Sequence, residues 1–586
     1  MTRDNEQSGP GSPPPFDLTV EPWLTVHLLR GEERELSLRE VFAQAGTIAR
    51  LSGDVPTQDF ALLRLLLAVL HDALDGPADV EEWAELWEAE SPFAAVPGYL
   101  DEHRSRFDLC HPATPFLQVA GLSNGKDEVL PLSRLVADVP NGDPFFTSRF
   151  PGVERLSFAE AARWLVHAHA YDTSGIKTGV LGDPLAKGGK AYAQGTAWAG
   201  ALGGVAAEGA SLKETLLLNL IAAEEYPPPG RAPDRPAWRR EPDGPGEGDL
   251  RHRPTGLRDL YTWQSRRVRL QAGPDGVLGA LLTYGDRLTP RNRMPLEPMT
   301  GWRRSRNQEK KHGEPLVYMP SEHDPERAAW RGLAALLESD SRPPETGARG
   351  EPAESLQPGL VHWLARLRNH GALPDEKMVR FRTYGTVYGT QQSVVDEIVA
   401  DEVAVPLVLL GDSDRRLRTC AVDAVARADT AVTALGLLAH DLVLATVPND
   451  KRRVRSNERT VAEISRDQAR DRAYGELDGH FRTWLAAIRP GDDVQELSAN
   501  WQATVRRELL RLATELLAAA GDRAWTGRTL ERKEGGERWI NSATAERRFH
   551  HSLAKALPHT RPAPTGAAAP DGPASPTSAD RPERPR

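Results

Sequence analysis

The pattern of apolar and polar residues along the 586-residue chain changes at about residue 394, from mixed to strongly helical. Before that point, Trp23 to Leu29 alternates as a half-buried strand does. Ser37 to Glu40 has the pattern of a capping box, which begins a helix. Phe60 to Leu74 is apolar on almost every side, which indicates a buried helix. The N-terminal part therefore mixes strands with helices.

Four long amphipathic segments follow residue 394: Arg415 to Thr446, Arg459 to Ile488, Asp493 to Ala520 and Ser542 to Leu557. Four helices with short connections predict a bundle. The fold class is therefore α+β, with a large mixed α/β domain over residues 16–393 and a four-helix bundle over residues 394–558. Residues 1–15 and 559–586 are rich in Pro and in small or polar residues, so we expect them to be disordered.

A glycine-rich stretch from Asp172 to Gly204 follows the period of neither a helix nor a strand, which predicts a loop. It contains nine glycines and three lysines. Ordering glycine costs conformational entropy, so a loop this long is usually functional or disordered. Glycine exposes backbone N–H groups and lysine binds phosphate. The stretch is therefore either a cradle for nucleic acid or phosphate, or a flexible surface excursion.

Two nucleotide-binding motifs fail when they are tested on this stretch. Gly189-Lys190 is followed by Ala191 where a Walker loop needs Ser or Thr, and Pro184 occupies the place of its first glycine. No G-x-G-x-x-G opens a helix after a strand there. A longer polyanion suits the stretch better than a nucleotide does.

The composition, with 39% hydrophobic and 27% charged residues, is that of a soluble globular protein of two or three domains. No apolar run reaches the roughly 18 residues of a membrane helix, and the N-terminus lacks the apolar core of a secretory signal. Cys110 and Cys420 are the only cysteines. They exclude a disulfide framework and a Cys-rich zinc site, and they indicate a reducing, cytoplasmic setting.

The net charge of −10 argues against indiscriminate binding to nucleic acid. One stretch is positively charged, because Arg287 to Lys311 contains eight basic residues and only two acidic ones. Such a loop can contact phosphates or enter a groove, although a solvated loop is the simpler interpretation. A local charge that opposes the global sign favours the functional interpretation.

Taken in succession, these features resemble the CasA family, the large subunits of the type I-E CRISPR surveillance complex, Cascade. The resemblance covers about residues 16–557. Phe16 to Trp23 looks like the family's opening strand, and Leu260 to Leu270, which we expect to be a strand, carries a Thr-Trp-Gln core. Phe107 to Gln118, the glycine-rich stretch and the four C-terminal helices complete the order.

The resemblance implies a subunit that is not an enzyme. Such a subunit recognises the short protospacer-adjacent motif in double-stranded DNA, helps to open the duplex for guide RNA pairing and recruits a helicase-nuclease. The implied partners are the guide RNA, the target duplex, the other Cascade subunits and the helicase-nuclease, with no membrane.

In this family a glycine loop, a basic finger and a glutamine wedge read the motif from the minor groove, whose code is degenerate. Carried onto this sequence, the loop role falls on Gly175, Lys177, Gly179, Gly188 and Gly189; the finger role on Arg287, Arg291 and Arg293; and the wedge role on Gln391, with Gln392 as the fallback. The family's finger is a lysine, so this chain departs from the pattern, but arginine suits a narrow minor groove.

Phe145 or Phe146 matches the position at which the family uses a loop aromatic near the 5′ handle of the guide RNA. Some relatives carry a cysteine cluster near the Thr-Trp-Gln core. This chain lacks such a cluster, so we expect no metal and no cofactor.

Two other functions remain open. One is a phosphate- or nucleotide-handling enzyme that uses the glycine-rich loop, although the failed motif tests and the lack of a paired-carboxylate or His/Cys constellation count against it. The other is a helical scaffold without nucleic-acid contact. Whether neutralising Arg291 and Arg293 changes DNA binding would distinguish such a scaffold from a DNA-binding subunit.

Overall fold

The structure is a computed structural model that describes residues 13–126, 129–137, 153–337, 352–410, 414–446, 460–531 and 537–560. The chain divides into two compact units, Met1–Ala426 with Asp478–Leu497, and Arg427–Leu477 with Ser498–Arg586. Most of the two ends that we expect to be disordered, and both Phe145 and Phe146, lie outside the described residues.

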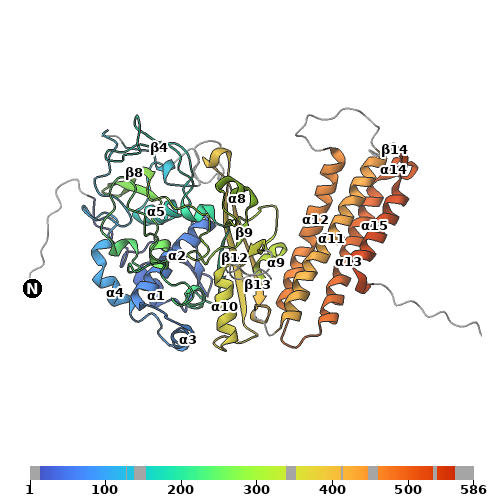
Figure 1. The fold of residues 1–586 in the computed structure, drawn as a ribbon, viewed down its shortest axis with the longest axis horizontal. Helices are drawn as coiled ribbons and strands as arrows, with labels where there is room; N and C mark the ends of the chain where they lie inside the picture. The colour runs from blue at the N-terminus through green and yellow to red at the C-terminus, as the bar shows by residue number, and fades with distance from the viewer. Residues whose placement is uncertain are drawn as a thin grey trace, which may run out of the picture. The chain divides into compact units, whose positions relative to one another are not determined.

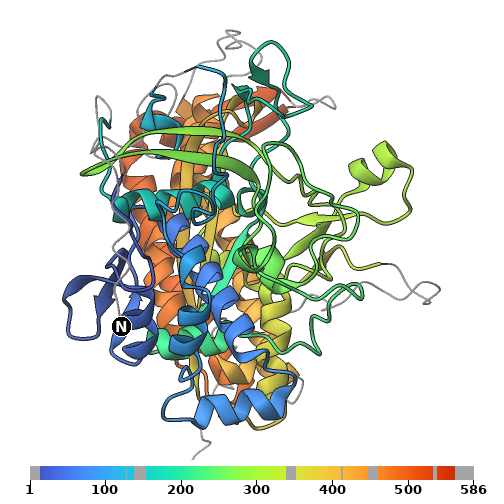
Figure 2. The same ribbon diagram turned by 90° about the vertical axis from the view of Figure 1, so that its left-hand side faces the viewer.

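The first unit combines helices with small antiparallel sheets (Figures 1 and 2), which confirms the α+β class. The sheets have the orders β2-β1-β3, β10-β9-β11 and β13-β12-β6, with the pairs β4-β5 and β7-β8. The strands are β1 Leu24–Leu28, β2 Glu33–Leu36, β3 Ile48–Leu51, β4 Lys177–Thr178, β5 Lys190–Ala191, β6 Gly204–Glu208, β7 Arg266–Gly273, β8 Gly276–Tyr284, β9 Trp302–Arg304, β10 Tyr318–Pro320, β11 Ser355–Leu356, β12 Met378–Tyr388 and β13 Val395–Pro406.

Several helices of this unit pack against α2 (Pro56–Leu74), which contains the predicted apolar run and is buried from Thr57 to Asp72. It contacts α4, α5, α6, α7 and the hairpin of β12 and β13. The other helices are α1 Leu38–Ala43, α3 Val80–Glu88, α4 Val96–Glu102, α5 Phe158–Tyr171, α6 Leu212–Asn219, α7 Leu257–Tyr261, α8 Arg306–His312, α9 Leu333–Leu337 and α10 Gly359–Asn369. A 3-10 turn, η3, spans Trp198–Ala201.

A buried ion pair fixes α2 to the loop that precedes β9. The Arg64 guanidinium donates to both carboxylate oxygens of Glu297 at 2.9 Å, and Trp198 Nε1 donates to the same carboxylate at 2.8 Å. Glu297 is fully buried, and the Arg64 guanidinium also lies 4.5 Å from the Tyr261 ring centre. One carboxylate therefore joins three segments that are distant in sequence.

The capping box at Ser37 is confirmed. The Ser37 hydroxyl accepts from the Glu40 N–H at 3.3 Å, while the Glu40 carboxylate accepts from the Ser37 N–H at 2.8 Å. Two of the N–H groups at the start of α1 are thereby satisfied.

Two strand predictions are wrong in part. Leu260 to Leu270 is strand only from Arg266 onward, because Leu257–Tyr261 forms α7. The Asp234 carboxylate, more than twenty residues upstream, accepts from the N–H groups of Arg258 and Asp259 and caps this helix.

The opening strand begins at Leu24, after the stretch Phe16 to Trp23, which contributes only an isolated bridge between Asp17 and Asp108. The Asp17 carboxylate accepts from the Thr19 N–H at 2.9 Å and holds a turn there instead.

A long antiparallel hairpin connects β12 to β13, with register from Met378↔Pro406 to Tyr388↔Val395. Strand β6 pairs along the other side of β12. The residues between the two strands, which include the candidate glutamines, therefore form the tip of the hairpin. The expected domain boundary at residue 393 lies at this tip, whereas the compact units divide after Ala426.

The second unit is a helical bundle. Its residues 427–477 and 498–556 contain most of four helices, α11 (Arg415–Thr446), α12 (Val461–Ala486), α13 (Val494–Ala519) and α15 (Ser542–Ala556). The four helices match the four predicted segments to within a few residues. Leu435, Leu477, Leu509 and Leu553 are buried inside the bundle. A short helix, α14 (Gly521–Thr526), and the pair of β14 (Arg528–Glu531) and β15 (Glu537–Ile540) precede α15.

Among the described residues, α11 alone is long and apolar enough to cross a membrane by length and composition. Most of its apolar window, 61%, is buried inside the structure, as in the core helix of a soluble protein.

We expect Glu297→Ala to lower the free energy of unfolding of the first unit by about 3–5 kcal/mol, because it leaves the buried Arg64 guanidinium without its carboxylate. Thermal and denaturant unfolding would measure the change. The control is Glu32→Ala, since the exposed pair of Glu32 with Arg34 at 3.1 Å should contribute less than about 1 kcal/mol. Equal losses in the two variants would contradict a central role for the buried pair.

Candidate nucleic-acid interface

A single buried arginine holds both ends of the glycine-rich stretch. Arg266, at the start of β7, is 2% exposed. Its guanidinium donates to the carbonyl oxygens of Asp172, Thr173 and Gly195, each at 3.0 Å, and to the Asp172 carboxylate. The loop therefore leaves and returns to the fold at one anchor.

The Asp172 carboxylate also pairs with Lys177 Nζ at 2.7 Å. Burial opposes ionisation of Asp172, but Lys177 and Arg266 outweigh that effect and lower the pKa of the carboxyl. Burial also lowers the pKa of Lys177, against the attraction of Asp172. Lys177, a candidate for motif recognition, thus directs its ammonium into this buried cluster, with only 10% of its side chain exposed.

Gly175 lies between the anchor and the tip of the β12–β13 hairpin. The Tyr284 hydroxyl accepts from the Gly175 N–H at 2.9 Å and donates to the Gly175 carbonyl oxygen at 2.5 Å. Gly175 has φ +145°, a conformation that side chains disfavour, and a Cβ at this position would lie 3.4 Å from Ser393 Cβ. The structure thus brings the glycine-rich stretch against the turn that carries the candidate glutamines.

The middle of the glycine-rich stretch, which we predicted as a loop, contains a short hairpin of β4 and β5. The residues between these two strands end in a two-residue turn that joins Lys187 to Lys190. Gly188 and Gly189 form this turn, with the φ values of +57° and +72° that a type I′ turn requires. Gly179 lets the two strands approach closely, because a Cβ there would lie 2.7 Å from the Lys190 nitrogen. Lys187 and Lys190 flank the turn and are exposed.

The candidate glutamines occupy a strained turn. Gln391 and Gln392 are exposed and have φ +55° and +56°, while the Ser393 N–H donates to the Thr390 carbonyl at 3.2 Å. This is again the geometry of a type I′ turn, which favours Asn-Gly. Left-handed backbone in non-glycine residues costs on the order of 1–3 kcal/mol each and concentrates at functional sites.

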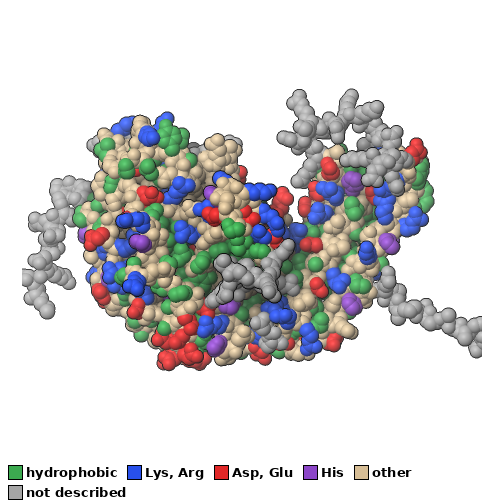
Figure 3. Space-filling view, in the orientation of Figure 1, with side chains coloured by type: hydrophobic (Ala, Val, Ile, Leu, Met, Phe, Trp, Pro, Cys, Tyr) green, Lys and Arg blue, Asp and Glu red, His purple; other side chains and the backbone are tan. Residues whose placement is uncertain are grey.

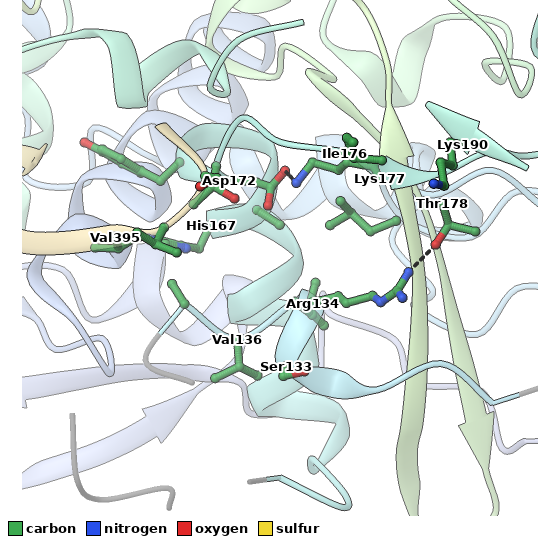
Figure 4. A pocket seen from close by; sticks show the side chains of 18 of the residues that line it. Ser133, Arg134, Val136, His167, Asp172, Ile176, Lys177, Thr178, Lys190 and Val395 are labelled. Atoms are coloured by element: carbon green, nitrogen blue, oxygen red, sulfur yellow. Dashed lines mark hydrogen bonds and ion pairs between the residues drawn. The ribbon is translucent and has the colours of Figure 1, made fainter. Parts of the chain in front are cut away.

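A cavity of about 450 Å³ opens between these elements (Figure 4). Its lining includes the cationic side chains of Arg134, Lys177 and Lys190, and it runs from the glycine-rich stretch to Ser393 and Val395. Arg134 donates to the Thr178 hydroxyl, and Lys177 pairs with Asp172 at the edge of the cavity (Figure 4). Asp172 also lines the cavity and offsets the charge of Lys177, while Arg134 and Lys190 suit an anionic group such as phosphate.

His167, which also lines the cavity, belongs to the core. It is 2% exposed, and burial lowers its pKa to about 3. Its Nε2 lies 2.9 Å from the Thr57 hydroxyl, and its ring stacks on Tyr171. A neutral imidazole satisfied in this way supplies no charge to the cavity.

The three candidate arginines lie in different surroundings. Arg287 is exposed just after β8, beside Gln194 and Tyr284 at the far end of the glycine-rich stretch. Arg291 instead pairs with Glu314 at 3.0 Å, and Arg293 donates to the Thr289 carbonyl at 3.3 Å. The structure therefore brings Arg287 to the glycine-rich stretch, whereas Arg291 and Arg293 bond to residues outside that stretch.

Negative charge gathers away from this region. The exposed acidic residues of α3, Glu81, Glu82, Glu85 and Glu88, form a red patch at the bottom of Figure 3, whereas β4 lies at the top of the same unit in Figure 1. The net charge of −10 is thus unevenly distributed. Within the described part of the chain, no group of three or more His, Cys, Asp or Glu side chains is placed to hold a metal ion.

Sequence reasoning missed the residues that assemble this site, Arg266, Tyr284, Ser393 and Arg134. The arginines of β7 were visible as a cluster, but nothing in their spacing indicates that Arg266 is turned inward.

We expect the double change Gln391→Asn with Gln392→Gly to raise the free energy of unfolding of the first unit by about 1 kcal/mol, because Asn-Gly adopts this turn with less strain. Thermal unfolding of the isolated chain would measure the shift. The reference is the change of both glutamines to alanine, which keeps the strain. An Asn-Gly variant that melts no higher than the alanine variant would contradict the strained-turn interpretation.

Comparisons with known proteins identify the family. The family model described as CRISPR-associated protein Cse1 matches residues 17–512. CRISPR-associated protein CasA/Cse1 of Thermus thermophilus is 33% identical over 357 residues, which span 59% of this chain and 64% of that protein, slightly less than two thirds of its length.

Two solved structures are similar over nearly their whole length. The crystal structure of Thermobifida fusca Cse1 has a TM-score of 0.83 and 51% identity, covering 93% of this chain and 99% of that one. Cse1 from Acidimicrobium ferrooxidans has a TM-score of 0.77 and 33% identity, covering 94% and 99%. The chain therefore belongs to the Cse1 (CasA) family of CRISPR-associated proteins, the large-subunit family of the type I-E surveillance complex, Cascade.

Proposed function

We propose that this chain is the large subunit of a guide-RNA surveillance complex, where it recognises the protospacer-adjacent motif in double-stranded DNA and helps to open the duplex. The observation that supports the proposal is the position of Gly175, where a Cβ would lie 3.4 Å from Ser393 Cβ. The glycine-rich stretch is thus close to an exposed, strained glutamine turn, and one cavity, whose lining includes Arg134 and Lys190, adjoins both.

Each element has a physical role in this proposal. The glycine backbone enters the minor groove where side chains would clash, and Arg287 is the candidate for the basic finger, since arginine suits a narrow groove. Gln391 inserts below the motif and unstacks a base step, at a cost of a few kcal/mol, so that pairing with the guide RNA can begin. Gln392, in the same turn, is the fallback. Arg291 and Arg293 would need to leave their present partners to take part.

The remaining roles come from family membership. The chain joins the other Cascade subunits in the cytoplasm, contacts the guide RNA handle through Phe145 or Phe146, and recruits the helicase-nuclease. Guide pairing supplies most of the sequence specificity, and protein reads only the short motif and the backbone. A net charge of −10 then suits a subunit whose own affinity for DNA is weak and sensitive to salt.

We propose a non-catalytic role for the chain. In phosphate-binding loops a glycine-rich turn leads into a helix whose N-terminal N–H groups hold the anion. Here the Gly188-Gly189 turn leads into β5, which favours a structural element for nucleic acid over a nucleotide-handling enzyme.

The test is duplex opening by the reconstituted complex, followed with a fluorescent base analogue beside the motif at fixed salt. We expect Gln391→Ala to slow duplex opening at least tenfold, because no glutamine side chain then fills the space between the unstacked bases. Binding to a target that is already melted should stay unchanged. Gln44→Ala, which removes another exposed glutamine in the first unit, is the control.

Normal opening by Gln391→Ala would move the wedge role to Gln392, for which the same assay decides. Normal opening by both single variants and by the double variant would exclude the glutamine turn from duplex opening. A chain that never joins a guide-RNA complex would contradict the proposed function itself.

A further inference from the structure

Tyr284 occupies an unusual position at the end of β8. Its side chain is buried, with 3% exposure, yet its hydroxyl both accepts from the N–H and donates to the carbonyl oxygen of the same residue, Gly175. Both backbone groups of one loop glycine are thus satisfied by one side-chain atom. Such a pair of bonds fixes the orientation of the peptide groups on both sides of Gly175 as well as its position.

The ring of Tyr284 is held as firmly as its hydroxyl. The Arg266 guanidinium lies 4.8 Å and Lys177 Nζ 5.8 Å from the ring centre, and both cations are anchored on Asp172. Cations over an aromatic face attract it electrostatically. The hydroxyl therefore presents Gly175 from a ring that cannot easily shift.

What Tyr284 holds is the part of the glycine-rich stretch that contacts the glutamine turn. Gly175 lies against Ser393, the residue after Gln392, with its unfilled Cβ position 3.4 Å from Ser393 Cβ. A second tyrosine fixes the same junction from the hairpin side, because the Tyr388 hydroxyl donates to the Tyr171 carbonyl oxygen at 2.7 Å. The spacing between loop and turn thus depends on the hydroxyl groups of two tyrosines.

We propose that Tyr284 is a positioning residue for motif recognition: its hydroxyl fixes Gly175 at the distance from the glutamine turn at which the loop can read the motif while a glutamine opens the next base step. The inference rests on the proposed function. It assigns Tyr284 no contact with DNA, and its effect passes through Gly175.

The test compares Tyr284→Phe with wild type, since this change removes only the hydroxyl and keeps the ring beside the two cations. Tyr318→Phe is the matched control, because Tyr318 is also fully buried and its hydroxyl donates to the Ala353 carbonyl in another sheet. In the isolated chain, we expect hydrogen exchange at Gly175 and its neighbours to speed up at least tenfold in Tyr284→Phe and to stay unchanged in Tyr318→Phe.

In the reconstituted complex, we expect Tyr284→Phe to reduce at least tenfold the ratio of affinities for duplexes with and without the motif. Its affinity for a melted target should match that of wild type. A merely structural role would lower both affinities together, or neither.

An unchanged ratio in Tyr284→Phe, or the same fall in Tyr318→Phe, would overturn the inference while leaving the proposed function intact. Unchanged exchange at Gly175 would overturn it as well. A wild-type complex that shows no motif preference would overturn the proposed function, and the inference with it, whatever the exchange data show.

Discussion

The candidate interface depends on the buried guanidinium of Arg266. An arginine removed from water is costly unless its donors are satisfied and its charge is paired. Here the Asp172 carboxylate supplies the charge, and carbonyls from both ends of the glycine-rich stretch accept from the remaining donors. The same guanidinium therefore ties together both ends of a segment of more than twenty residues, which leaves α5 at Asp172 and contains only the short β4–β5 pair.

Around this anchor, the site combines rigidity with stored strain. Tyr284 holds Gly175 through two hydrogen bonds, whereas Gln391 and Gln392 are held in a turn whose backbone conformation non-glycine residues disfavour. Departures from local turn preference are expected at functional sites, where stability is given up for geometry. A long hairpin can support such a tip, because the ladder of β12 with β13 fixes the turn from both sides.

Features that arise from nearby residues were predictable from the sequence. The four bundle helices follow from apolar periodicity, and the Ser37 cap needs only Glu40, three residues away. The helix α7 was missed because its cap, Asp234, lies outside the local pattern.

The candidate site residues also divide into those that the sequence indicated and those whose role depends on distant residues. The family resemblance indicated Gln391 and Gln392, but the burial of Lys177 depends on Arg266, 89 positions further along the chain. No local period reports whether an arginine or lysine faces water or a carboxylate. The sequence therefore indicated which residue types gather near the loop, while the division between structural and exposed cations required the fold.

That division between structural and exposed cations bears on the proposed binding of DNA. Arg266 and Lys177 are committed to Asp172, and Arg291 to Glu314. Near the loop, Lys187, Lys190 and the Arg287 guanidinium are exposed and carry no ion pair with the described residues. Because three cations release few counterions from a duplex, the proposed binding of DNA by this subunit alone would be weak, and still sensitive to salt, although less steeply than that of a basic DNA-binding domain. Weak contact lets a complex sample and leave many sites, and it leaves stable capture to guide pairing once the duplex is open.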